Sequence, residues 1–146
     1  IATIAELWSH SPARSLPGAL WRLYLLQLMI HDDAQTSALL YERGRTRLSS
    51  ADVVIAGAPA PASPDELVSL IDLILRGVFA GDFALALERA AAFSRVVAAG
   101  ATDVADDYDS SEPQRASQFT TRALRLDTYA GDLVAAAALW RRDGLT

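Results

Sequence analysis

Residues 63–100 read SPDELVSLIDLILRGVFAGDFALALERAAAFSRVVAAG, and this stretch decides the fold class of the chain. It begins with Ser63, Pro64 and Glu66, the order of a capping box. In a capping box the serine side chain accepts a hydrogen bond from a backbone N–H of the first turn, and the glutamate side chain accepts one from the backbone N–H of the serine. The proline has a φ that suits the first helical position. Leucine, isoleucine and valine then recur every three or four residues, which predicts a helix with one face in a core.

The second half of the stretch predicts another helix. Gly81 is expected to end the first helix in a left-handed conformation, and Asp82 is expected to cap the next. A short connection of this kind makes two helices antiparallel neighbours. Gly100 is the predicted stop of the second helix. Its predicted core stripe consists of Phe83, Ala86, Leu87, Ala90, Phe93 and Val97.

Composition excludes several kinds of chemistry. The 146 residues suit one domain, and a hydrophobic content of 51% indicates a large core or a subunit interface. There is no cysteine, lysine or asparagine, so all thirteen basic residues are arginine. Disulfide frameworks, thiol nucleophiles, lysine Schiff bases and phosphate-loop lysines are therefore impossible within this chain.

Charge and hydropathy bear on the partners. A net charge of −5 argues against a general nucleic-acid surface. The best apolar run, Leu23 to Ile30, is far shorter than the roughly 18–20 residues of a membrane span, and Gln27 interrupts it. We therefore expect a soluble, cytoplasmic protein with no nucleic-acid and no membrane partner.

Turn signals divide the chain into three expected helical hairpins, near residues 16–48, 63–100 and 112–143. The third is expected to contain a helix from Pro113 to about Tyr129, a break at Gly131-Asp132, and a last helix from Leu133 to Arg142. Two linkers are expected between the hairpins: a surface segment, Ser49 to Ala62, with a β-prone run at Val53 to Ile55, and an acidic loop, Ala101 to Glu112. The prediction is one all-α domain of about six main helices, 1–146, alone or within a longer chain.

The hairpins share a turn sequence. Phe79-Ala80-Gly81-Asp82-Phe83 is echoed fifty positions later by Tyr129-Ala130-Gly131-Asp132-Leu133. With the small and aromatic residues that follow, the pattern resembles a degenerate tetratricopeptide repeat, whose second helix reads Gly-Asp-aromatic, then small, then aromatic. The spacing of fifty departs from the 34 residues of that family. The family's conserved small position is also occupied here by Leu25, Ile74 or Leu124.

This resemblance implies a stack of hairpins with a non-enzymatic groove for a peptide or partner helix. An irregular helical bundle that uses the same turns is the alternative. One subtype does not fit, because the family's clamp for C-terminal carboxylates relies on lysine and asparagine, which are absent.

A row of polar residues marks one side of the helix that begins at Pro113. Arg115, Gln118, Arg122 and Arg125 fall at helical spacings, opposite an apolar side. Guanidinium groups in such a row can hold a carboxylate or phosphate bidentately. The alternative is a solvated face that pairs with the acidic linker before it.

Other charged clusters have simpler interpretations. Arg43, Arg45 and Arg47 suit the negative end of a helix dipole. The carboxylates of 103–112 invite a calcium hypothesis, but they lack the glycine and final glutamate of an EF-hand loop and fit a solvated, capping segment better. His31-Asp32-Asp33 fits a turn with a helix cap better than a metal or acid–base site. We expect no catalytic residue, no metal site and no cofactor.

The final helix offers a possible surface for self-association. Leu133, Leu139 and Trp140 are large apolar residues beside a run of four alanines, so the helix is either enclosed or an interface. The leading hypothesis is a non-enzymatic protein–protein interaction or adaptor domain with a protein or peptide partner, or a homodimer. The alternative is a small-molecule-sensing regulatory domain with an apolar pocket between helices. Enzymatic activity is left open and disfavoured.

Overall fold

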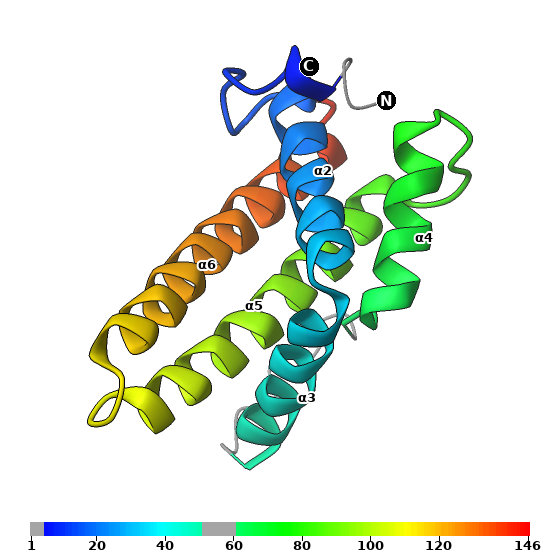
Figure 1. The fold of residues 1–146 in the computed structure, drawn as a ribbon. Coiled ribbons are helices and arrows are strands. Elements are labelled where there is room, and N and C mark those ends of the chain that lie inside the picture. The colour runs from blue at the N-terminus through cyan, green and yellow to red at the C-terminus, as the bar shows by residue number, and fades with distance from the viewer. Residues whose placement is uncertain (1–4, 51–60) are drawn as a thin grey trace.

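The computed structural model describes residues 5–50 and 61–146, with the side chains of residues 49 and 50 left out (Figure 1). The described residues contain five long helices and no strand: α2 (Leu16–Asp32), α3 (Ala34–Ser50), α4 (Pro64–Leu75), α5 (Phe83–Tyr108) and α6 (Pro113–Arg141). The predicted all-α class is confirmed. The predicted β-prone run at Val53 to Ile55 lies outside the described residues.

The two longest helices, α5 and α6, form the main pair. They run antiparallel over almost their whole lengths and are joined by residues 109–112 (Figure 1). The buried side of α6 repeats at intervals of three, four and seven residues, the spacing of a coiled-coil seam. Most of this seam is alanine, which lets the two backbones approach closely: Ala116, Ala123, Leu126, Ala130, Leu133 and Ala137.

Two corrections follow from these lengths. The segment expected as an acidic loop, Ala101 to Glu112, is helical as far as Tyr108. The expected break at Gly131-Asp132 is wrong, because α6 continues through both residues. Asp132 does not cap a helix; its carboxylate accepts from Nε of Arg22 in α2 at 2.8 Å. The seam against α5 holds both halves of α6 in one helix, and this outweighs the low helix propensity of one glycine.

Helices α2 and α3 follow one another end to end. Only Asp33 separates them, and in Figure 1 α3 continues away from the end of α2 instead of folding back beside it. A hairpin between helices needs a loop of about two to five residues. Residues 16–48 therefore form a bent rod and not the expected hairpin.

A close crossing of α3 over α5 fixes the centre of the molecule. A Cβ atom on Gly44 would lie 1.8 Å from the carbonyl oxygen of Val96, and one on Gly100 would lie 1.8 Å from that of Leu40. The backbones of α3 and α5 are therefore in direct contact at Gly44 and Gly100, where no side chain keeps them apart. Gly100 is a contact point inside α5, so its predicted role as a helix stop is wrong.

The capping box of α4 is confirmed. The backbone N–H of Glu66 donates to Ser63 Oγ, and the Ser63 N–H donates to Glu66 Oε1, both at 3.3 Å. The predicted end of this helix is wrong. α4 stops at Leu75, and Gly77, with φ of 73°, takes the left-handed position expected for Gly81. The N–H of Gly77 bonds to the Ile74 carbonyl and that of residue 78 to the carbonyl of residue 73, which is a Schellman motif.

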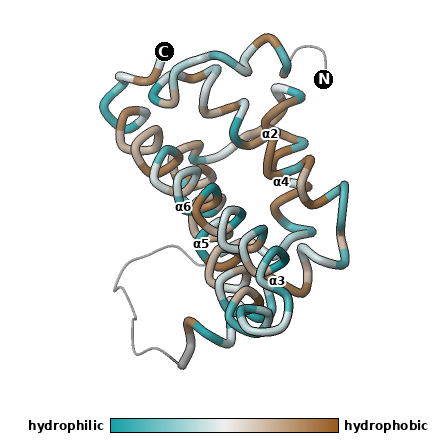
Figure 2. Tube along the Cα trace, turned by 60° about the vertical axis from the view of Figure 1, so that its left-hand side comes forward, coloured by the Kyte–Doolittle hydropathy of each residue, from teal (hydrophilic) through white to brown (hydrophobic). Residues whose placement is uncertain are grey.

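Asp82 caps α5 as predicted, because its carboxylate accepts from the Leu85 N–H at 3.1 Å. α4 nonetheless lies mainly against α2 and touches α5 less. Figure 2 shows α2 and α4 mostly in hydrophobic colours, as two apolar helices packed together require. The described fold is thus a long α5–α6 pair, with the α2–α3 rod across it and α4 beside α2.

Candidate functional site

The N-terminal half of α6 has two faces. One face packs on α5 through Ala116, Ala123 and Leu126. The other carries the four residues predicted to bind an anion or a partner. Arg115, Gln118 and Arg125 are exposed and Arg122 is half-buried.

Two adjoining cavities lie along this second face, between α6 and the junction of α2 with α3. The larger has a volume of about 1010 Å³, and Arg115, Gln118 and Arg122 all line it. The smaller, of about 300 Å³, is lined by Arg122 and Arg125. Arg122 and Asp33 line both cavities, which are therefore neighbours. We call the combined depression the α6 groove.

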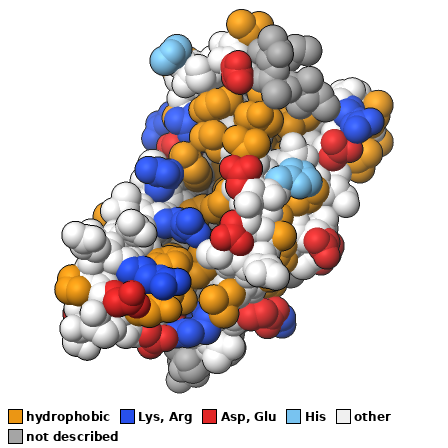
Figure 3. Space-filling model, viewed as in Figure 1, with side chains coloured by type: hydrophobic (Ala, Val, Ile, Leu, Met, Phe, Trp, Pro, Cys, Tyr) orange, Lys and Arg blue, Asp and Glu red, His pale blue; other side chains and the backbone are white. Residues whose placement is uncertain are grey.

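The walls of the groove differ in chemistry. Figure 3 shows several arginine side chains on this face of the molecule, with hydrophobic side chains between them. Most of the apolar lining belongs to the smaller cavity and comes from α2 and α6: Leu25, Leu26, Leu28, Met29, Leu126 and Tyr129. A groove with this lining can bind a ligand that carries both negative charge and apolar surface.

Two of the arginines lie close to aromatic rings. The Arg115 guanidinium carbon lies 4.6 Å from the centre of the Tyr108 ring, and that of Arg122 lies 5.6 Å from the centre of the Phe119 ring. The two rings stack on each other with centres 6.4 Å apart. A cation–π contact needs none of the N–H donors of a guanidinium, so they stay available for a ligand.

The arginines have little internal neutralisation. Arg115 reaches the Glu112 carboxylate only at 4.0 Å, and both side chains are about half exposed. Within the described residues, Arg122 and Arg125 form no ion pair. Arg122 and Arg125 therefore face the groove with their guanidinium groups outside any ion pair, while Asp32, Asp33 and Glu112 also line it.

The opposite wall contains Asp33, which is the residue of the predicted capping turn His31-Asp32-Asp33 that caps α3. Its carboxylate accepts from the Thr36 hydroxyl at 2.6 Å and from the Thr36 N–H at 3.0 Å. These two hydrogen bonds lower the pKa of Asp33, the hydroxyl contributing most, and the charge of Arg122 adds a smaller effect. Asp33 is therefore an anion at neutral pH, and both of its oxygens are already engaged.

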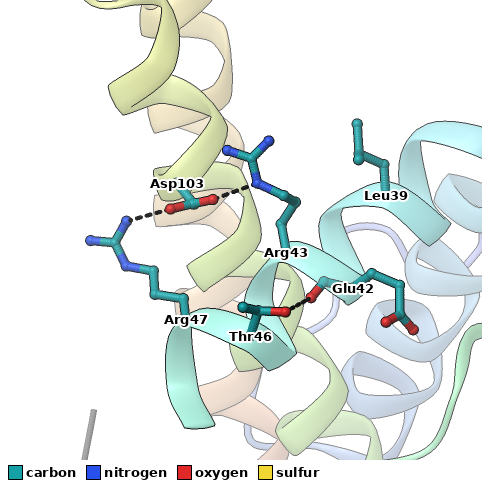
Figure 4. A pocket seen from close by; sticks show the side chains of 6 residues that line it. All are labelled: Leu39, Glu42, Arg43, Thr46, Arg47 and Asp103. Atoms are coloured by element: carbon teal, nitrogen blue, oxygen red, sulfur yellow. Dashed lines mark hydrogen bonds and ion pairs between the residues drawn. The ribbon is translucent and has the colours of Figure 1, made fainter. Parts of the chain in front are cut away.

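A second arginine cluster, between α3 and α5, is different (Figure 4). Arg43 donates to Asp103 and to Asp107, each at 2.5 Å, and Arg47 lies 3.1 Å from Asp106 and 3.5 Å from Asp103. The hydrogen bonds to Asp107 and Asp103 raise the pKa of Arg43. A cavity of about 390 Å³ lies here, but its charges pair with one another, so we assign the cluster to helix packing.

Sequence reasoning missed this cluster. It assigned Arg43 and Arg47 to the dipole of their own helix and the aspartates to a loop. The signal was present in the spacing, because Arg43 and Arg47 are four residues apart, as are Asp103 and Asp107. Arginines and aspartates with the same spacing predict that their two helices pack side by side, once the acidic segment is recognised as helical.

The residues predicted as a self-association surface separate in the structure. Leu133 is fully buried in the α5–α6 seam, which is the enclosed alternative for this residue. Leu139 is half-buried, and Trp140 is 41% exposed, with its ring against the edge of Phe83 at 4.8 Å between centres. Self-association through Leu139 and Trp140 stays a prediction.

Over residues 5–50 and 61–146, no group of three or more histidine, aspartate or glutamate side chains is placed to hold a metal ion. None of the described helices combines the length and the apolar character needed to cross a membrane. Comparison of the chain with protein-family models, curated proteins and solved structures finds no match. The tetratricopeptide resemblance therefore stays a prediction.

Proposed function

We propose that this chain is a non-enzymatic interaction domain, and that it binds a segment of a partner protein in the α6 groove. The observation that carries the proposal is the row Arg115, Arg122 and Arg125 beside an apolar wall, in which Arg122 and Arg125 form no ion pair with a described residue. Arginine and aromatic residues next to apolar surface are the composition of binding hot spots.

The contrast between the two arginine clusters supports this choice. Arg43 and Arg47 have aspartate partners within the chain, so they need no ligand. Arg122 and Arg125 have no such pair with a described residue, yet they adjoin surface that a ligand can cover. An arginine without an ion pair at the edge of a groove suits a carboxylate brought by another molecule.

The absence of cysteine from the sequence allows a direct test. A single cysteine at Gln118, inside the groove, or at Thr128, on the exposed side of α6, can be modified with a bulky maleimide. Peptides selected from a random display library on the unmodified protein are expected to lose binding to modified Gln118→Cys and to keep it on modified Thr128→Cys. Peptides that bind both modified proteins equally, or a library that gives no binder, would contradict the proposal.

A second candidate function rests on the smaller cavity. Its volume of about 300 Å³ and its combination of Arg122 and Arg125 with apolar side chains suit a small carboxylic acid. This volume is at the lower end of the roughly 300–1,000 Å³ usual for ligand pockets. A saturable rise in melting temperature with an aliphatic or aromatic carboxylic acid, abolished by Arg125→Ala, would favour this sensing function. No rise across a panel of such acids would leave the peptide function preferred.

A further inference from the structure

We infer that the occupant of the α6 groove is an acidic, amphipathic helix whose carboxylates pair with Arg115, Arg122 and Arg125. The inference rests on the proposed function, that the groove binds a segment of a partner protein. It adds the chemical class and the conformation of that segment.

The acidic character follows from the state of the arginines. Arg115 and Arg122 lie within cation–π distance of Tyr108 and Phe119, which restricts where the guanidinium groups can go before a ligand arrives. Their in-plane donors match the two oxygens of a carboxylate, and little side-chain entropy remains to be lost on pairing. A basic or purely apolar segment would leave these charges desolvated without partners, which is costly.

The helical conformation follows from the spacing of the arginines. Along α6, Arg115 and Arg122 are about 10.5 Å apart, and Arg122 and Arg125 about 4.5 Å. A helix lying along α6 has the same rise, so acids at positions i, i+7 and i+10 or i+11 share one of its faces. An extended segment advances about 3.3 Å per residue, so 10.5 Å corresponds to about three residues and places successive acids on opposite sides.

The apolar wall requires the occupant to be amphipathic. Leu25, Leu28 and Met29 line the groove across from the arginines, and Leu28 is 38% exposed. Apolar residues on the same face of the occupant, between its acids, would cover this wall. The result is the helix-in-groove mode of recognition, in which anchors recur every three or four residues.

Other anions fit less well. The groove also carries Asp33 and Glu112, and Asp32 lines the smaller cavity. A nucleic-acid backbone or a sheet of anionic headgroups brings dense negative charge that these carboxylates and the net charge of −5 repel. A peptide can place three carboxylates opposite the arginines and neutral residues opposite the aspartates.

The test examines the sequences and the conformation of peptides selected for binding in the α6 groove. The α6 segment from Pro113 to Tyr129 is about 24 Å long, so a random library of roughly 16 residues covers it. Peptides that are blocked by modified Gln118→Cys are expected to carry Asp or Glu at i, i+7 and i+10 or i+11, and to gain helical circular dichroism on binding. Arg122→Ala is expected to weaken their binding at least about tenfold, the usual effect of losing a charge-assisted hydrogen bond. The control Arg95→Ala, at an exposed position of α5, is expected to leave it unchanged.

A charge-reversal variant distinguishes loss of binding from loss of folding. Arg122→Glu should select peptides with Lys or Arg at the facing position, which an unfolded variant cannot do. Groove-binding peptides without the acidic pattern, or with unchanged affinity for Arg122→Ala, would overturn this inference and leave the proposed function intact. Arginine-dependent binding of phosphatidylserine vesicles in place of peptides would also overturn it. Peptides that bind equally well before and after modification of Gln118→Cys would instead contradict the proposed function.

Discussion

Gly44 and Gly100 show how single residues set the geometry of this protein. Both lie within helices, and each meets a carbonyl oxygen of the other helix at a distance that no Cβ atom tolerates. A carbonyl group in a helix cannot move aside as a flexible side chain can. The two glycines therefore fix how closely α3 crosses α5.

We expect Gly100→Ala to lower the free energy of unfolding by about 1–3 kcal/mol, because the added methyl group overlaps the Leu40 carbonyl. Urea unfolding measures the change. Gly131→Ala is the matched control, since Gly131 is in α6 with nothing within 4 Å of an added Cβ. It is expected to stabilise the protein by about 0.5–1 kcal/mol through helix propensity alone. Equal effects of the two substitutions would refute the close crossing.

The cap formed by Asp33 predicts a dependence of stability on pH. Its hydrogen bonds from Thr36 lower its pKa below the ordinary value of 3.8. The cap therefore contributes stability above the unfolded pKa, and this contribution is lost as the pH falls through the folded pKa. In an NMR titration of the side-chain carboxyl, Thr36→Val is expected to raise the pKa of Asp33, while Thr121→Val leaves it unchanged. The same pKa in Thr36→Val and the parent protein would show that the hydroxyl bond is not formed.

At the scale of elements, the pairing of α3 with α5 combines the glycine crossing with the Arg43–Arg47 cluster. The side chains of Asp103 and Arg43 are about one-third exposed, so solvent screens their attraction. We expect Asp103→Asn to lower the free energy of unfolding by about 0.5–1 kcal/mol. The loss should shrink in about 1 M NaCl, where charges are screened over a few ångströms.

Asp127→Asn is the control for this charge effect, because Asp127 is exposed on α6 and has no ion pair with a described residue. It should change stability little at either salt concentration. A loss for Asp103→Asn that persists undiminished in high salt would indicate a packing defect in place of a broken ion cluster.

Local signals predicted the starts of the helices well and their ends poorly. Ser63, Asp33 and Asp82 cap helices as expected, because a cap depends on a few neighbouring residues. Gly100 and Gly131 were expected to interrupt helices that in fact continue. Whether a helix continues through glycine depends on what packs against it, and neither the Leu40 carbonyl nor the α5–α6 seam is visible from local sequence.

At the scale of the whole molecule, the site also divides into a part set by local sequence and a part set by packing. Helical spacing was enough to place Arg115, Gln118, Arg122 and Arg125 on one face, and the structure has them along one groove. The opposite wall, with Leu25, Met29 and Asp33, comes from residues about ninety positions earlier. Its position depends on α2 and α3 forming a bent rod, whereas the sequence had suggested a hairpin, so the wall could not be predicted.

The central claim is that the α6 groove is the partner-binding surface of this domain. Amide chemical-shift mapping of the labelled protein, titrated with a peptide selected on it, tests this most directly. We predict that the largest shifts fall within residues 25–36 and 113–129, with α4 unaffected. Largest shifts on α4, or around Trp140 at the far end of α6, would contradict the claim.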